Sequence, residues 1–79
     1  MQTITMLESP YKTRYAVLRA IIRPCETGGY WAEIPNLHCN TDGDTLYEVE
    51  KNMYEAVLAS IDDYPAITDY MIMFEVRNA

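Results

Sequence analysis

The segment from residue 44 to residue 61 constrains the fold most strongly, because its pattern fits only one kind of element. Thr45 and Glu48 have the spacing of a capping box, in which a hydroxyl and a carboxylate accept hydrogen bonds from free amides at a helix start. Apolar residues then recur every three or four positions, with polar residues on the opposite side: Leu46, Val49, Met53, Val57 and Ile61 against Glu48, Lys51, Asn52 and Glu55. The segment predicts an amphipathic helix lying on a sheet.

Strand patterns surround this helix. Residues 15–23 alternate, and the even-numbered side chains are uniformly apolar, so they form the predicted core face: Ala16, Leu18, Ala20 and Ile22. Gly28 and Gly29 predict a turn, after which residues 30–34 return as the second strand of a hairpin. Residues 38–41 predict a short third strand. Residues 69–77 predict a last strand with one apolar face: Tyr70, Ile72, Phe74 and Val76.

The predicted order of elements is βββαβ. This order indicates an α+β fold in which one helix packs on a small antiparallel sheet. A length of 79 residues suffices for one domain with a modest core. Residues 1–14 contain Ser9-Pro10 and show no sustained periodicity, so we interpret them as a mobile or weakly attached lead-in. We therefore expect a single domain over residues 1–79.

Charge is unevenly distributed along the chain. Twelve Asp and Glu residues against six Lys and Arg residues give a net charge of −6, and Lys51 is the only base between Glu26 and Glu75. Such a chain repels phosphate backbones, so we expect no direct DNA binding, whereas a basic partner would be attracted. Solubility alone also accounts for moderate negative charge. The sequence shows neither a membrane-spanning stretch nor a signal peptide, which predicts a cytoplasmic protein without membrane association.

Two neighbouring segments carry a family pattern. They are GGYWAEIPNL at residues 28–37 and CNTDGDTL at residues 39–46, followed by Glu48. This pattern resembles the HicB antitoxin family, over a stretch from about Tyr15 to Ile61. The chain departs from the family at His38, which stands alone where the family has Pro-Gly, and at Glu50, near which the family has aliphatic residues or alanine. The resemblance implies a partial RNase H fold and a non-enzymatic role.

The resemblance also implies partners. HicA toxins, the partners of HicB proteins, are small basic ribonucleases, and an acidic domain would neutralise one by covering its RNA-binding face. Larger HicB proteins carry a DNA-binding module after this domain. Because the chain ends at Ala79, directly after the last predicted strand, we expect no operator binding. HicB-like domains commonly pair, so the resemblance implies a homodimer as well.

Amphipathic and acidic side chains are the candidate partner-binding residues: Tyr30, Trp31, Glu33, Tyr47, Glu48, Tyr54 and Glu55. Aromatic residues suit binding surfaces, but a small sheet with one helix also needs them in its core. Tyr47 and Tyr54 fit either the core edge or an interface. Met71 and Met73 alternate with the core face of the last strand, so they are exposed unless a partner covers them. We expect them in the interface of a symmetric homodimer.

Three functions remain open on the sequence. The first is an antitoxin that neutralises a HicA-like basic ribonuclease toxin. The second is an orphan or mobile-element inhibitor, which would occupy a nucleic-acid site on another enzyme. The third and weakest is a metal-dependent nuclease built on Asp42, Asp44 and Glu48, although turn and helix-start roles account for these residues.

The cysteines do not predict a disulfide or a metal site. Without a secretion signal, Cys25 and Cys39 are expected to be reduced thiols in or near the core. Together with His38 they supply too few ligands for structural zinc. We predict no cofactor, no metal and no catalytic residue.

Overall fold

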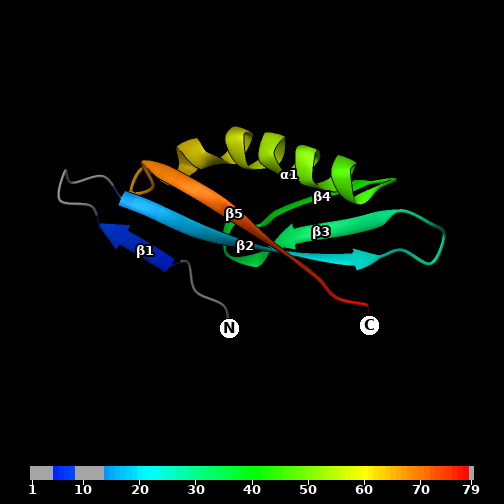
Figure 1. The fold of residues 1–79 in the computed structure, drawn as a ribbon. Helices are drawn as coiled ribbons and strands as arrows, with labels where there is room; N and C mark the ends of the chain where they lie inside the picture. The colour runs from blue at the N-terminus through cyan, green and yellow to red at the C-terminus, as the bar shows by residue number, and fades with distance from the viewer. Residues whose placement is uncertain (1–4, 9–13, 79) are drawn as a thin grey trace.

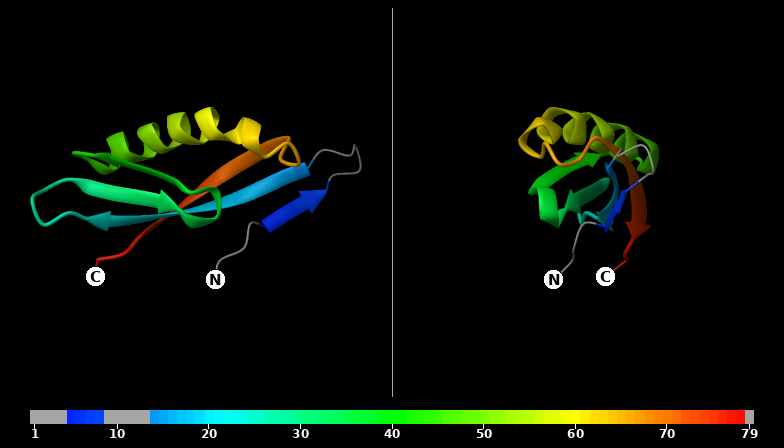
Figure 2. Two further views of the ribbon diagram at one scale, coloured as in Figure 1. Left: turned by 180° about the vertical axis from the view of Figure 1, so that it is seen from behind. Right: turned by 90° about the vertical axis from the view of Figure 1, so that its left-hand side faces the viewer.

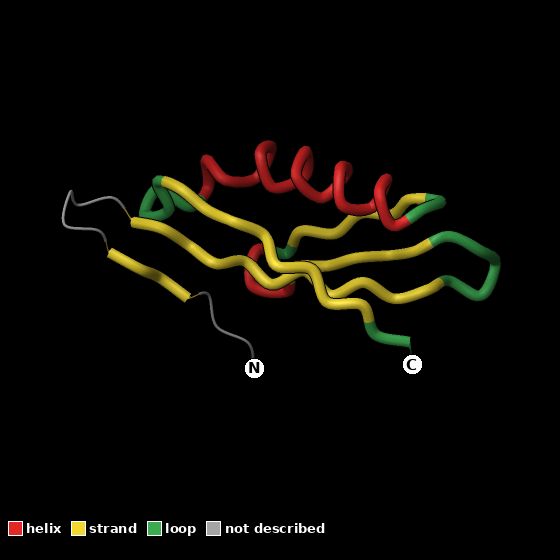
Figure 3. Tube along the Cα trace, in the orientation of Figure 1, coloured by secondary structure: helices red, strands yellow, loops and turns green. Residues whose placement is uncertain are grey.

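The computed structural model describes residues 5–8 and 14–78, which form a five-stranded sheet with one α-helix on it (Figure 1). In chain order the elements are β1 (Thr5–Glu8), β2 (Arg14–Pro24), β3 (Tyr30–Ile34), the 3-10 helix η1 (Pro35–Leu37), β4 (Cys39–Gly43), α1 (Leu46–Ser60), the 3-10 helix η2 (Ile61–Asp63) and β5 (Asp69–Val76). Figure 3 shows the helical and strand segments along the chain. The predicted α+β class is confirmed. Within the described residues, no helix has the length and apolar character that a membrane crossing requires.

β2 is the longest strand and organises the sheet. Its later half pairs antiparallel with β3, and β3 pairs antiparallel with β4, as the predicted hairpin and third strand require. β5 pairs with β2 in parallel, in an unbroken register from Tyr15 opposite Asp69 to Ile22 opposite Val76. The prediction of an antiparallel sheet is therefore wrong in this respect, because the sheet is mixed.

The direction of β5 follows from the path of α1. Figure 1 shows α1 running from the hairpin end of the sheet back to the end where β2 begins. Its 15 residues cover about 22 Å, which returns the chain over most of the paired length of β2. β5 then starts beside the start of β2 and runs in the same direction. Since β1 and β3 both pair along one edge of β2, β5 occupies the other edge.

β1 lies inside the segment that the sequence predicts to be a lead-in. It pairs antiparallel with the start of β2, from Thr5 opposite Val17 to Glu8 opposite Arg14. A strand of four residues is too short to show a reliable alternation, which explains why the sequence does not predict it. Residues 1–4 and 9–13 of the predicted lead-in lie outside the described residues.

The core lies between α1 and the face of the sheet that α1 covers (Figure 2). The even-numbered side chains of β2 are at most 1 % exposed there, as predicted: Ala16, Leu18, Ala20 and Ile22. The centre of the predicted helical stripe is fully buried against them: Val49, Met53 and Val57. At the start of the stripe Leu46 is 40 % exposed. On β5, Ile72 is buried and Phe74 packs against the core, whereas Val76 is exposed.

The start of α1 has the predicted cap. The Glu48 amide donates to the Thr45 hydroxyl oxygen at 3.1 Å. The Glu48 carboxylate in turn accepts from the Asp44 amide at 3.0 Å, one residue before the position usual in a capping box. These bonds satisfy amides that have no partner inside the helix, so they define where α1 begins.

Candidate partner-binding surface

Three large apolar side chains project from α1 on a different side from its buried stripe. Tyr47 is 74 % exposed, Leu58 is 66 % exposed and Tyr54 is 46 % exposed. Positions seven and four residues apart share one side of a helix, so the three side chains form a row, which we call the α1 ridge. Lys51 lies on the same side, between Tyr47 and Tyr54. Tyr54 also packs at a tilt against Phe74 of β5, with 6.0 Å between the ring centroids.

Acidic side chains flank the α1 ridge. In helical projection Glu50 lies on one side of the ridge, and Glu48 and Glu55 lie on the other. All three are exposed, and within α1 Lys51 is the only base. The η2 turn that follows α1 adds further exposed acids. An apolar row between carboxylates matches a partner that presents apolar side chains within a basic surface.

A pocket of about 400 Å³ adjoins the N-terminal end of α1. Its lining includes three acids, Asp42, Asp44 and Glu48, together with residues of the β2–β3 loop. The side-chain amide of Asn52 donates to the Asp42 carbonyl at 2.8 Å and so ties α1 to the end of β4. The pocket extends the acidic surface of α1 toward the tip of the hairpin.

The same three carboxylates are the residues on which the nuclease interpretation depends. Across residues 5–8 and 14–78, no group of three or more His, Cys, Asp or Glu side chains is arranged to hold a metal ion. The Glu48 carboxylate is engaged by the helix cap.

The predicted partner-binding residues divide between two faces of the protein. Those on α1 are Tyr47, Glu48, Tyr54 and Glu55, and Tyr30 lines the adjoining pocket. Trp31 and Glu33 project from β3 on the face opposite α1, because adjacent strand residues alternate and Ala32 and Ile34 occupy the core face. The predicted residues therefore do not form one continuous surface. Leu58 is not among the predicted partner-binding residues, although its apolar side chain outside the buried stripe, four positions after Tyr54, was a usable signal.

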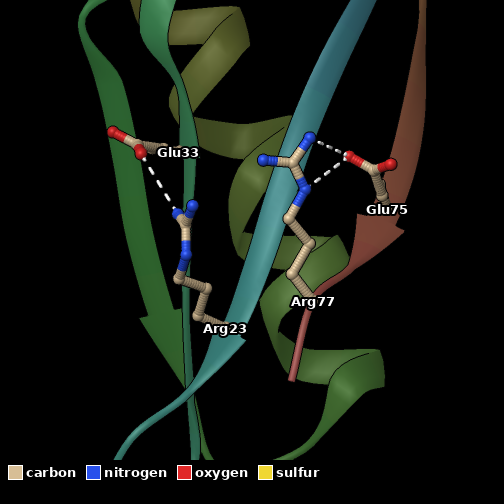
Figure 4. A network of polar contacts seen from close by, with 4 residues as sticks. All are labelled: Arg23, Glu33, Glu75 and Arg77. Carbon is tan, nitrogen blue, oxygen red and sulfur yellow. Dashed lines mark hydrogen bonds and ion pairs between the residues drawn. The ribbon is translucent and has the colours of Figure 1, made fainter. Parts of the chain in front are cut away.

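Two Arg–Glu pairs lie on the face opposite α1 (Figure 4). Arg23 contacts Glu33 at 3.4 Å, and Arg77 contacts Glu75 at 2.8 Å. Ile21 lies in register between the two glutamates and is only 3 % exposed, although it is on the face that α1 leaves open. Glu33 is thus engaged within the protein.

The two cysteines are free and lie in contrasting environments. Cys39 is buried in the core as predicted, with its Sγ 3.9 Å from the sulfur of Met53. Burial raises the pKa of the Cys39 thiol, and a hydrogen bond with the Ser60 side chain opposes that effect only in part. Cys25 is exposed in the β2–β3 loop, so its predicted placement in or near the core is wrong. The exposed His38 adopts a left-handed conformation at the end of η1.

We expect a thiol reagent to distinguish the two cysteines. At pH 8 iodoacetamide should modify Cys25 rapidly and Cys39 at least about 100-fold more slowly, because only an accessible thiolate reacts. The raised pKa of Cys39 lowers its thiolate fraction at every pH below that pKa, so protection should persist from neutral to mildly alkaline pH. Mass spectrometry of the labelled peptides measures both rates. Equal rates in native buffer would contradict the buried position of Cys39, and equal rates in 8 M urea are the control.

Comparison with known proteins identifies a relative. The chain is 39 % identical over 49 residues to the UPF0150 protein ssl0738 of Synechocystis sp., and the match covers 61 % of this chain and 68 % of the relative. The chain belongs to the UPF0150 family. The UPF0150 family is related to HicB-like proteins, which agrees with the sequence resemblance at the level of the family. No family model matches the chain. No solved structure matches it significantly.

Proposed function

We propose that this UPF0150 domain is a HicB-like antitoxin that binds a small basic ribonuclease toxin through the α1 ridge and its acidic flanks. In this proposal the domain covers the RNA-binding face of the toxin and performs no chemistry itself. The observation that carries the proposal is the exposed row of Tyr47, Tyr54 and Leu58 between carboxylates on α1. The relationship of the UPF0150 family to HicB-like proteins adds support.

Charge and apolar area have separate roles in such a complex. A ribonuclease needs basic side chains to contact phosphates, so the carboxylates beside the α1 ridge compete with RNA for the same groups. Their long-range attraction raises the association rate, by an amount that falls as salt is added. Tyrosine is enriched among the residues that dominate binding energy, so Tyr47 and Tyr54 are the expected anchors that slow dissociation.

Coexpression tests the proposal. The gene neighbourhood is inspected for a small basic reading frame, which is expressed alone and then together with this protein. The toxin alone should arrest growth, and coexpression should restore growth and yield a complex that copurifies. A neighbourhood without such a gene, combined with failure to rescue cells from any HicA-like toxin, would contradict the proposal. Recovery of a different nuclease as the bound protein would favour the orphan inhibitor instead.

Substitutions on α1 should weaken this complex without unfolding the domain. Tyr47→Ala removes a highly exposed anchor and should raise Kd about tenfold. Glu55→Lys should slow association about three- to tenfold at low salt, and the difference should shrink as salt rises. Glu26→Lys, in the exposed β2–β3 loop, changes the net charge equally and is the matched control. Surface plasmon resonance measures both rates, and equal effects of the two lysine variants would contradict a binding site on α1.

A further inference from the structure

The side of α1 that faces away from the sheet has the residue spacing of a coiled-coil seam. Four exposed residues follow one another at intervals of four, three and four positions: Tyr47, Lys51, Tyr54 and Leu58. Alternating steps of three and four are the pattern of the a and d positions in a heptad, which face a second helix. Among the described residues no element covers this side of α1 (Figure 2). We call the four positions the heptad seam, which extends for about 17 Å.

Lys51 is the polar interruption of this seam. Glu48 and Glu55 lie within helical reach of it, three and four positions away, yet Lys51 takes part in neither of the ion pairs formed between described residues. A lysine at a single a position weakens a helix pair but selects the partner helix and its register. A carboxylate on the second helix is the group that complements Lys51.

The positions that flank the seam are acidic. Glu48 and Glu55 lie at e positions along one side, and Glu50 lies at a g position along the other. Side chains at e and g positions reach across to the second helix and decide which helix binds. Two copies of α1 would set these carboxylates against one another, so the flanks disfavour a second copy of this chain. They favour a helix that carries lysine or arginine along its flanks.

The seam is ordered before any partner binds. The ring of Tyr54 packs against Phe74 of β5, with 6.0 Å between the ring centroids, and the buried stripe holds α1 on the sheet. A side chain that is already held in place loses less conformational entropy on binding. Tyr54 is therefore suited to be the central apolar contact of the seam.

We propose that the heptad seam of α1 binds one amphipathic helix of the partner, which is basic along its flanks and has a carboxylate opposite Lys51. This inference rests on the proposed function, because it names the element of the toxin that occupies the α1 ridge. Apolar side chains of that helix pack between Tyr47, Tyr54 and Leu58, at the crossing angle of about 20° that such seams adopt. The carboxylate distinguishes the partner from any other polycation, since a uniformly basic helix places a like charge at Lys51.

Synthetic helical peptides test this inference without the toxin. The first peptide, about three heptads long, has leucine at the a and d positions, lysine at the flanks and glutamate at the central a position. The second has lysine at that central position, and the third scrambles the first without changing its composition. By fluorescence anisotropy the parent protein should bind the glutamate peptide about three- to tenfold more tightly than the lysine peptide. The general attraction of an acidic protein for positive charge predicts the opposite order.

Lys51→Glu should reverse this preference about three- to tenfold, and circular dichroism should stay unchanged because Lys51 is exposed. Arg19→Glu is the matched control, since it makes the same charge change at an exposed residue of β2, away from α1, and should keep the order of the parent protein. Equal binding of the scrambled peptide, or no binding of any peptide, would overturn the seam. A preference that Lys51→Glu leaves unchanged would overturn the carboxylate opposite Lys51.

The coexpression experiment separates this inference from the proposed function. With the toxin, Lys51→Glu should lower the yield of copurified complex at least about threefold, although it makes the domain more acidic. An undiminished yield would overturn the inference and leave the antitoxin function standing. Absence of any toxin would contradict the proposed function, and the peptide measurements would still decide whether α1 binds a helix of this kind.

Discussion

Met53→Ala should lower the free energy of unfolding by about 2–5 kcal/mol, because it removes a fully buried side chain from the centre of the core. Met53 lies on α1 and meets the sulfur of Cys39 across the interface with β4. Truncation leaves a cavity that well-packed neighbours fill only in part. A loss of this size is a large fraction of the stability of a small domain. Urea unfolding followed by the fluorescence of the single tryptophan, Trp31, measures it.

Leu58→Ala is the matched control for this experiment. Leu58 lies on the same helix, but its side chain is 66 % exposed, so its truncation should change stability by no more than about 0.5 kcal/mol. The contrast separates burial from helix propensity, since alanine favours the helix at both positions. A loss for Met53→Ala that does not exceed the loss for Leu58→Ala would show that α1 does not pack on the sheet as described.

Gly29→Ala should destabilise the protein by about 2–4 kcal/mol through two effects that add. Gly29 has a φ of 75°, in the left-handed region that an alanine side chain disfavours. A Cβ at this position would also lie 2.8 Å from the carbonyl oxygen of Gly43, which is backbone and cannot rotate away. Thermal unfolding by circular dichroism measures the combined cost.

Gly28→Ala separates the two effects. Gly28 also has a positive φ, of 102°, but a Cβ there would meet nothing within 4 Å. This variant should therefore show only the conformational cost, about 1–2 kcal/mol. A larger loss for Gly28→Ala than for Gly29→Ala would contradict the close approach of the hairpin turn to the end of β4.

Most secondary-structure elements could be predicted because each of them carries its own periodic signal. The even-numbered residues of β2 and the centre of the α1 stripe are buried as alternation and helical spacing assign them, whereas Leu46 at the start of the stripe and Val76 at the end of the β5 face are exposed. The helix cap at Thr45 involves only residues within one turn, so the sequence alone predicts its position. β1 could not be predicted, since its four residues acquire their structure only by pairing with β2.

The candidate binding surface could be predicted only in part. Helical spacing places Tyr47 and Tyr54 on one side of α1 from the sequence alone, but it leaves open whether they are core or surface. The exposure of the α1 ridge depends on which side of the helix meets the sheet. Trp31 and Glu33 have side chains that suit a binding surface, but they lie on the face of the sheet opposite α1, and the sequence does not reveal this separation.

The sequence by itself determined where the helix begins, which face of β2 lies in the core and that the domain is acidic. These properties depend on composition or on residues close together in the sequence, so they can be predicted without knowledge of the fold. Tertiary structure decided that β5 runs parallel to β2, that Ile21 is buried on the face opposite α1 and that one edge of β5 carries no described strand. Strand alternation identifies a face but not a neighbour, and the choice of neighbour depends on how α1 carries the chain back across the whole sheet.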